Sequence, residues 1–401
     1  MNAVVARLAG FLGLKRNVGI LLAAIALIAV GEEMWFRFLP KYLEVLGASV
    51  FLIGLYDAIK TLLGAVYAYP GGLLADRWGH RRALLAFTAL SIAGYLVLLL
   101  SDRPGAVIAA LFFVLAWTGL SLPATFSLVG ASLPAGKHAM GIGVQSLIRR
   151  IPVLIGPLVG GFLMDRLGIV PGVRVGVVVS AVLASAAILL QMNLRDTGQA
   201  LDPGRPSLVD LWNSSNPALR RLLLSDILIR FCERIPFAWI VIYAMNDLGM
   251  SASQVGLLLA IEMGAAIACY IPASHLADRY GREPFVIVTF VFFTIFPLTL
   301  LAASSFPWLA VAFAVRGLKE FGEPARKALI ISYSPPACRG QVIGAYYLVR
   351  DVLVTGGAFL GAALWSRGAA VNFWTAAFIG MVGTAVYVVT LPESRAQKIT
   401  S

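Results

Sequence analysis

The chain has 401 residues, of which 59% are hydrophobic and 13% are charged, and its formal net charge is +12. A soluble domain has roughly 25% charged residues and fewer than half apolar ones, so this composition excludes a soluble protein and indicates a polytopic membrane protein. The positive charge then concerns membrane orientation rather than nucleic-acid binding. The three cysteines, Cys232, Cys269 and Cys338, have no paired spacing, which argues against a disulfide framework and a metal site.

Apolar runs long enough to cross a membrane recur along the whole chain. A spanning helix needs about 20 mostly apolar residues. Twelve helices are predicted, at residues 18–45, 49–74, 82–101, 105–132, 138–164, 170–193, 220–246, 252–276, 283–303, 307–333, 339–365 and 370–391. The first is expected to be uncleaved and preceded by a short amphipathic segment. We therefore predict an all-α membrane protein with twelve transmembrane helices.

The long polar stretch at residues 194–219 separates the first six predicted helices from the last six. Its Pro and Gly residues are typical of a linker, and Ser207 to Trp212 are compatible with a short interfacial helix. The expected domains are an N-terminal six-helix bundle at 1–193, a cytoplasmic linker at 194–219 and a C-terminal six-helix bundle at 220–401.

Lys and Arg residues near the ends of the predicted helices and in the segments between them are unevenly distributed. Most of them fall in the termini and the even-numbered connections, whereas the odd-numbered connections carry Lys41, Arg103, Arg166, Arg174 and Arg367. Cytoplasmic segments of membrane proteins carry the excess of positive charge. We therefore expect both termini in the cytoplasm. The protein is further expected to be a monomer in the lipid bilayer of the plasma (inner) membrane.

A short charged connection follows the second predicted helix and returns after the eighth. The first copy contains Gly72, Asp76, Arg77, Gly79 and Arg81, and the second contains Asp278, Arg279, Gly281 and Arg282. The two aspartates are 202 residues apart, half the chain length, which indicates a duplicated protein.

Other matches extend this repeat at a spacing of 201 residues. They pair Pro123-Ala124 with Pro324-Ala325, Pro134 with Pro335, Gly143 with Gly344, Arg149 with Arg350, Gly156 with Gly357 and Gly160 with Gly361. The expected arrangement is two six-helix halves related by an axis along the membrane normal, with a central site between them.

Charged residues well inside the predicted helices are the candidates for the functional site. Each costs about 2.5–3.5 kcal/mol at the bilayer centre when it faces lipid, so these side chains must face one another or water. The acids are Glu32, Glu33, Asp57, Glu233, Glu262, Glu320, Glu323 and Asp351. The bases are Arg37, Lys60, Arg149, Arg150, Arg230, Arg234, Arg316, Lys319, Arg326, Lys327 and Arg350. None of them falls in the third, sixth, ninth or twelfth predicted helix.

The first and seventh predicted helices carry neighbouring charges near mid-membrane. Glu32 and Glu33 are adjacent, with Arg37 one turn above Glu33, and the seventh helix has Arg230, Glu233 and Arg234. Adjacent carboxylates in a low dielectric repel each other and favour the protonated form, which makes proton exchange feasible. We predict Glu33 or Glu32 as the proton carrier, with Glu233 next. The alternative is that each acid is the structural partner of a neighbouring arginine.

The fifth and eleventh predicted helices carry Arg149 and Arg350 at equivalent positions. Two guanidinium groups can clamp an anionic group bidentately. Equally, Asp351, Asp57 or Glu262 can neutralise them as ion pairs. Aromatic residues expected either to line the same cavity or to pack between helices are Trp35, Phe36, Trp239, Tyr243, Tyr346 and Tyr347.

The tenth predicted helix is the most polar. Its charges recur at steps of three and four, which places them on one helix face. They are Arg316, Lys319, Glu320, Glu323, Arg326 and Lys327. Two interpretations stay open: i,i+4 pairs of Glu323 with Lys319 and Lys327 neutralise the stripe, or its unpaired members bind substrate or exchange protons.

The first charged connection resembles the signature of the major facilitator superfamily of secondary transporters, Gly-x-Leu-Ala-Asp-Arg-x-Gly-Arg-Arg, and the resemblance covers essentially the whole chain. The matching residues are Gly72, Leu74, Ala75, Asp76, Arg77, Gly79, Arg81 and Arg82. The resemblance implies two pseudo-symmetric six-helix bundles in which every third helix is peripheral, in agreement with the charge-free helices. It also implies a conformational latch that favours the outward-facing state; the other interpretation is a solvated basic loop.

The fifth predicted helix contains Gly156, Pro157, Gly160 and Gly161, similar to the Gly-Pro-rich motif of the family's drug/proton antiport branches. It departs from that motif at Pro152, where the pattern has Gly. Plain small-residue packing is the alternative interpretation. The family's arginine motif for proton coupling is absent from the fourth helix, and a similar spacing, Arg316 to Gly322, occurs in the tenth.

The helices, the repeat and these motifs together predict a secondary active transporter that works by alternating access, with proton-coupled efflux of a small amphipathic organic compound or drug. One alternative is an organic-anion uptake or exchange carrier that uses Arg149 and Arg350. An alternative from another class is a transport-inactive membrane sensor or scaffold. An enzyme is not expected, because the chain offers no nucleophile–base arrangement, and no cofactor, metal or nucleic-acid partner is expected.

Overall fold

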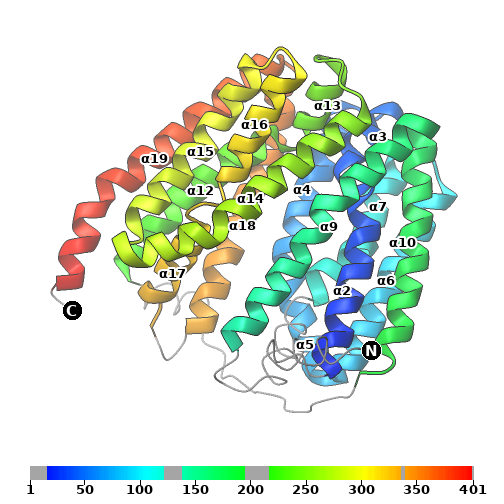
Figure 1. Cartoon of the computed structure of the whole chain (residues 1–401), viewed down its shortest axis with the longest axis horizontal. Coiled ribbons are helices and arrows are strands. Elements are labelled where there is room, and N and C mark those ends of the chain that lie inside the picture. Colours follow the sequence, from blue (N-terminus) through cyan, green and yellow to red (C-terminus); the bar gives the residue numbers. More distant parts are fainter. Residues whose placement is uncertain (1–15, 122–137, 195–215, 336–338, 400–401) are drawn as a thin grey trace. The chain divides into compact units, whose positions relative to one another are not determined.

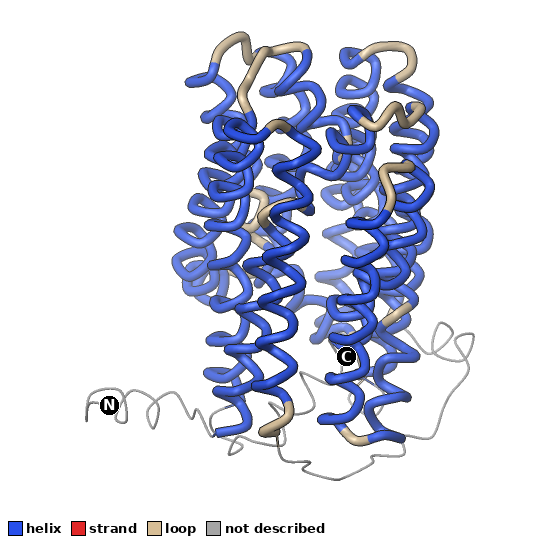
Figure 2. Tube along the Cα trace, turned by 90° about the vertical axis from the view of Figure 1, so that its right-hand side faces the viewer, coloured by secondary structure: helices blue, strands red, loops and turns tan. Residues whose placement is uncertain are grey.

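The computed structural model describes residues 16–121, 138–194, 216–335 and 339–399, and within these ranges the chain is helical apart from short connections (Figure 2). No strand occurs among them. The predicted N-terminal amphipathic segment, the predicted interfacial helix from Ser207 to Trp212, and the repeat positions Pro123, Ala124 and Pro134 lie outside the described residues.

The first compact unit comprises residues 1–47 and 63–203. Its described helices are α2 (Arg16–Glu33), η1 (Phe36–Phe38), α3 (Leu39–Val45), α5 (Ala68–Trp78), α6 (His80–Leu100), α7 (Pro104–Leu115), the π-helical η2 (Ala116–Leu120), α9 (His138–Leu167) and α10 (Ile169–Gln191). Within this unit α2 packs mainly against α9 and α10, and α6 packs against α7 and α10 (Figure 1).

The second compact unit comprises residues 48–62 and 204–401, so that most of α4 (Val50–Val66) groups with it. Its other helices are α12 (Pro217–Phe237), α13 (Trp239–Asn246), α14 (Ala252–Tyr280), α15 (Glu283–Ala302), α16 (Phe306–Leu318), α17 (Glu323–Tyr333), α18 (Arg339–Trp365) and α19 (Ala369–Ile399). Here α12 packs mainly against α18 and α19, just as α2 packs against α9 and α10 in the first unit.

The described helices follow the predicted spans. Seven of them are long and apolar enough to cross a membrane by themselves. Several other predicted spans are divided into two helical segments, with the break at Tyr67 between α4 and α5, at Ala238 between α12 and α13, and at Lys319–Gly322 between α16 and α17. The predicted all-α membrane fold is confirmed.

The repeat recurs in the packing of each unit. Gly160 of α9 lies so close to the backbone carbonyl of Met34 that a Cβ atom there would overlap it. Gly361 of α18 lies in the same way against the carbonyl of Ile235, and both members of this contact are shifted by 201 residues. Small residues allow two helix backbones to approach closely. The same helix crossing is therefore built twice.

The two charged connections share a backbone conformation. Gly79 ends α5 with φ 82° and Gly281 ends α14 with φ 94°. This left-handed region is readily open only to glycine, since other L-residues are strained there. The second glycine of the repeated motif is thus explained by the turn that it makes.

Candidate functional site

Glu32 of the first unit is bound by hydroxyl groups. It lies at the end of α2, where the next residue, Glu33, is the last of the helix. Tyr95 of α6 donates a hydrogen bond of 2.7 Å to its Oε1 atom, and Thr118 of η2 donates one of 3.4 Å to Oε2. Within the described part of the chain no lysine or arginine forms an ion pair with Glu32.

Glu33 has a different environment from its neighbour. Its Oε2 atom is 3.2 Å from Nε of Arg37, one helical turn above, as the sequence suggested. Gly156 of α9 packs directly against Glu33, and Gly160 packs against the next residue, Met34. The glycines of the fifth predicted helix therefore bring α9 against α2 at the point where α2 ends.

Glu233 of the second unit is bound by two bases. Its Oε1 atom is 2.7 Å from Nζ of Lys319, and its Oε2 atom is 2.8 Å from Nη1 of Arg230. Lys319 also lies 3.5 Å from Glu262, whose other oxygen is 2.9 Å from Arg316. These five side chains form an alternating chain of acids and bases.

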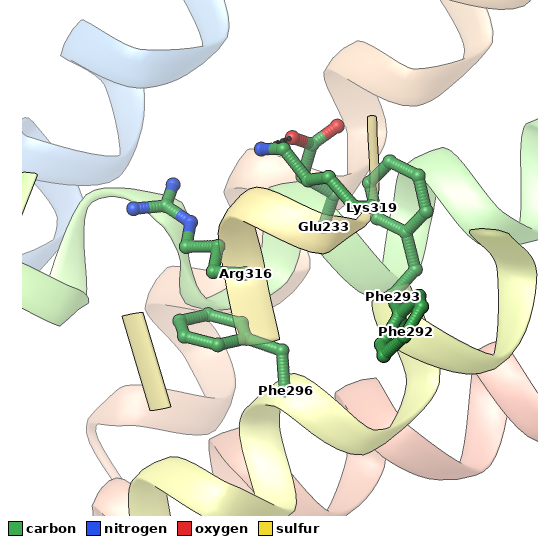
Figure 3. Close-up of a pocket in the computed structure, with 6 residues that line it drawn as sticks. All are labelled: Glu233, Phe292, Phe293, Phe296, Arg316 and Lys319. Carbon is green, nitrogen blue, oxygen red and sulfur yellow. Dashed lines mark hydrogen bonds and ion pairs between the residues drawn. The ribbon is translucent and has the colours of Figure 1, made fainter. Parts of the chain in front are cut away.

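A small pocket lies beside this chain of ion pairs. Its lining residues are Glu233, Phe292, Phe293, Phe296, Arg316 and Lys319 (Figure 3). The Arg316 guanidinium lies 5.2 Å from the ring centre of Phe296, and the Lys319 amine lies 5.7 Å from that of Phe293. Its volume of about 10 Å³ is room for about one water molecule.

Asp226 of α12 is a buried acid that the sequence analysis missed. Its carboxylate lies 2.6 Å from Arg326, 3.4 Å from Arg350 and 3.8 Å from Arg230. The hydroxyl of Tyr346 donates a further hydrogen bond of 2.9 Å to it. Asp226 lies near the start of its helix and was not counted as buried, although its i,i+4 spacing to Arg230 was a usable signal.

The charges of the tenth predicted helix do not form the continuous stripe that was expected. The helix is broken at Lys319–Gly322, where the N–H of Gly322 donates to the hydroxyl of Thr289. Proline at the start of α17 lacks an N–H, which also favours a new helix start. The expected i,i+4 pairs are replaced by contacts of Glu323 with Arg326 at 2.8 Å and with Arg230 at 2.7 Å.

The two pseudo-symmetric arginines differ in their partners. Arg350 is bound by Asp351 at 2.7 Å and by Asp226 at 3.4 Å. The Nε atom of Arg149 is buried and has no hydrogen-bond partner among the residues that the structure describes. Arg350 therefore has two carboxylate partners, whereas the Nε atom of Arg149 has none among the described residues.

The remaining predicted residues are distributed over both units. Arg234 pairs with Asp57 at 2.9 Å inside the second unit. Lys60 lies 4.8 Å from the ring centre of Phe237, and Arg150 and Glu320 are half-buried.

The side chains of the charged connections are only partly described. Arg77 and Arg279 are exposed, and Arg279 lies 5.4 Å from the ring centre of Tyr280. The side chains of Asp76 and Asp278, the centre of the expected latch, lie outside the described part of the structure. The latch therefore stays a prediction.

Two of the aromatic residues that were expected either to line a cavity or to pack between helices make packing contacts inside their own units. Trp35 is fully buried and donates a hydrogen bond of 2.8 Å to Ser180. Trp239 is buried and stacks on Trp365 with ring centres 5.1 Å apart. Both contacts are those of helix packing.

The two helical units repeat each other's packing, and both contain ion pairs in their interior. Charged side chains are costly inside a bilayer and mark substrate or ion pathways, so this arrangement is that of a membrane transport protein. The chain belongs to the Major Facilitator Superfamily, whose family model matches residues 21–232 and 222–401. It is therefore a secondary transporter and an integral membrane protein, not an enzyme.

Similar proteins match nearly the whole chain. The multidrug resistance protein MdtG of Proteus mirabilis is 28% identical over 91% of this chain and 93% of its own length. The MdtG protein of Salmonella arizonae is 26% identical over 87% of this chain and 89% of its own length. A crystal structure of a POT family transporter in complex with a thioalcohol-conjugated peptide has the same fold, with a TM-score of 0.78, 14% identity and coverage of 96% and 97% of the two chains.

Proposed function

We propose that this chain exports small amphipathic organic compounds in exchange for protons by alternating access. Two relatives that cover most of its length are named multidrug resistance proteins. Glu32 is the observation that supports proton coupling, because only hydroxyl groups bind its carboxylate among the described residues. A carboxyl group without a fixed countercharge can gain and lose a proton when its surroundings change.

The proposed cycle couples the inward movement of protons to the departure of substrate. When the site is open to the outside, the Glu32 carboxylate takes up a proton as the substrate departs. When the site is open to the cytoplasm, Glu32 releases that proton as the next substrate binds. In this proposal the protein acts as a monomer in the plasma (inner) membrane with both termini in the cytoplasm, and the repeated charged connections act as its latch.

Transport in proteoliposomes tests this function. Purified protein is reconstituted, and the movement of a panel of lipophilic dyes, including ethidium, is followed with and without an imposed pH gradient. We expect the gradient to drive dye movement, and we expect Glu32→Gln to abolish this response while dye-for-dye exchange continues. Glu33→Gln is the matched control, since Glu33 already has Arg37 as a partner. A wild-type protein that moves none of the dyes in response to the gradient would contradict the proposal.

A second candidate, an organic-anion carrier, is supported by Arg149 alone. Its Nε atom is buried without a hydrogen-bond partner among the described residues, so an anionic group is a suitable ligand. Arg350 is already bound by Asp226 and Asp351. An anion carrier should lose substrate binding on Arg149→Lys and keep it on Arg350→Lys, and an exporter of neutral or cationic compounds should keep binding in both.

A further inference from the structure

The surroundings of Glu32 recur in the second unit with different chemistry. At a spacing of 201 residues, the counterparts of Ala29, Glu32, Tyr95 and Thr118 are Arg230, Glu233, Phe296 and Lys319. All of these counterparts except Arg230 line the pocket in Figure 3. Each half of the duplicated protein therefore contains a glutamate at the same place in the fold.

The two glutamates also occupy equivalent positions in three dimensions. Thr118 of η2 reaches Glu32, and Lys319, at the break after α16, reaches Glu233. The helix crossing next to each glutamate is the same, since Gly160 packs against Met34 and Gly361 packs against Ile235. The different partners therefore result from substitutions at matching positions and not from a different packing of the helices.

These substitutions change what each carboxylate can do. Lys319 and Arg230 place two positive charges within 3 Å of the Glu233 oxygens, at 2.7 and 2.8 Å. Opposite charges at this range strongly favour the ionised carboxylate. In the first unit the matching positions carry the hydroxyl of Thr118 and the methyl group of Ala29, which supply no charge.

The other groups around Glu32 do not supply the positive charge that Lys319 supplies to Glu233. On its own helix Glu33 is bound by Arg37. Helix α9 presents Gly156 and Gly160 at this level, with Arg149 and Arg150 about two turns away from Gly156.

The remaining neighbour of α2, helix α10, is also uncharged at this level. It presents Ser180 against Gly31 and Gly176 against Trp35. Tyr95 and Thr118 complete the surroundings from α6 and η2. None of these described contacts is a fixed countercharge for Glu32.

We propose that the duplicated glutamates have diverged into one proton-exchanging site, Glu32, and one permanently neutralised site, Glu233, in which Lys319 takes the place of the second proton. Thr118 is then the positioning residue whose lack of charge keeps Glu32 exchangeable. This inference rests on the proposed proton-coupled transport and deepens it. It fixes the stoichiometry at one proton for each transport cycle.

Exchanging the chemistry of the two sites tests the inference. Thr118→Lys places an amine beside Glu32, and an opposite charge within ~4–6 Å favours the ionised carboxylate by a factor of about 10 to 1,000. We expect pH-gradient-driven dye transport to fall at least ~10-fold while dye-for-dye exchange, which needs no proton, stays within about twofold of wild type. Thr118→Ser, which keeps the hydroxyl group, is the control and should behave as wild type.

The second unit supplies an independent variant. Glu233→Gln combined with Lys319→Met removes a neutral pair and leaves Glu262 bound to Arg316 and Arg230 bound to Glu323. We expect this double variant to keep both pH-driven transport and one proton per dye molecule, measured as the proton-to-dye ratio at which opposing gradients balance.

The outcomes separate this inference from the proposed function. A wild-type protein without any pH response contradicts the function itself. A coupled wild type with a ratio of two, or a Thr118→Lys protein that keeps full pH-driven transport, overturns the assignment of the two sites and leaves proton coupling intact. Loss of pH-driven transport in the double variant, with exchange preserved, also overturns it.

Discussion

The Asp226 carboxylate neutralises several of the charged groups in the interior of the second unit. It is fully buried and is shared by three arginines and the hydroxyl of Tyr346. A buried ion pair adds little net stability compared with an apolar pair, but removing one partner leaves the others uncompensated. Asp226 therefore offsets the free-energy cost of burying the nearby arginines.

Replacing Asp226 with Asn should destabilise the protein severely. We expect the free energy of unfolding to fall by about 3–5 kcal/mol, because Arg326 and Arg350 lose a buried countercharge. Chemical unfolding of the detergent-purified protein measures this change. Asp351→Asn is the control: its side chain is 29% exposed, so its loss should cost at most about 1 kcal/mol. Equal losses in the two variants would show that Asp226 is not the principal partner.

The two halves of the repeat have kept the same helix crossings. The first helix of each unit packs against the last two, and a glycine of the fifth or eleventh predicted helix faces the backbone of the first or seventh. Pairs such as Gly160 and Gly361 have the same local task, although the charges around them differ. Backbone spacing has therefore been retained while the side chains diverged.

Two glycines of α18 should respond in opposite directions to Ala. Gly361→Ala introduces a methyl group against the carbonyl of Ile235, so we expect a loss of about 1–3 kcal/mol from overpacking. Gly344→Ala meets nothing within 4 Å and should raise stability by up to about 1 kcal/mol through helix propensity. Unfolding of both variants in detergent checks the signs. A Gly361→Ala protein with unchanged stability would mean that α18 and α12 can move apart at no cost in free energy.

One side-chain acceptor stabilises the break between α16 and α17. The hydroxyl of Thr289 on α15 accepts the hydrogen bond from the N–H of Gly322. Thr289→Val keeps the shape and removes the acceptor, so we expect a loss of about 1–3 kcal/mol from the unsatisfied buried N–H. Thr299→Val on the same helix is the control, since that hydroxyl bonds only to a carbonyl of its own helix, Phe296, among the described contacts. Similar losses at both positions would argue against a specific role for Thr289.

At the scale of the whole molecule, the distribution of positive charge predicts orientation. Connections with few Lys and Arg residues are expected outside the cell, including the one between α18 and α19. The connection after α5, with Arg77 and its neighbours, is expected in the cytoplasm.

Cysteine labelling checks this orientation. In a variant whose native cysteines are replaced, Ser366→Cys should react in intact cells with a membrane-impermeant maleimide, whereas Trp78→Cys should react only after permeabilisation. Both positions are exposed, so access to reagent differs only by membrane side. The reverse labelling pattern would invert the proposed topology.

The sequence by itself determined the membrane helices, the duplication and the helices that carry charge, because insertion into a bilayer depends on local runs of about 20 residues and a repeat is visible as a fixed spacing. It also selected Glu32, Glu33 and Glu233 as candidates. Tyr95 and Thr118 were missed, since a lone hydroxyl in an apolar helix gives no signal.

Only the tertiary structure decided which acids are neutralised. Lys319 binds Glu233 across 86 residues of sequence, and Arg326 binds Asp226 across 100, although nearer partners were available along the chain. Pairing follows from where helices cross and where they break, as at Lys319–Gly322, and these are non-local outcomes of packing. The same packing brings Tyr95 and Thr118 to Glu32 in the first unit and Lys319 to Glu233 in the second, so the substitutions at these matching positions show their effect only once the helices are placed.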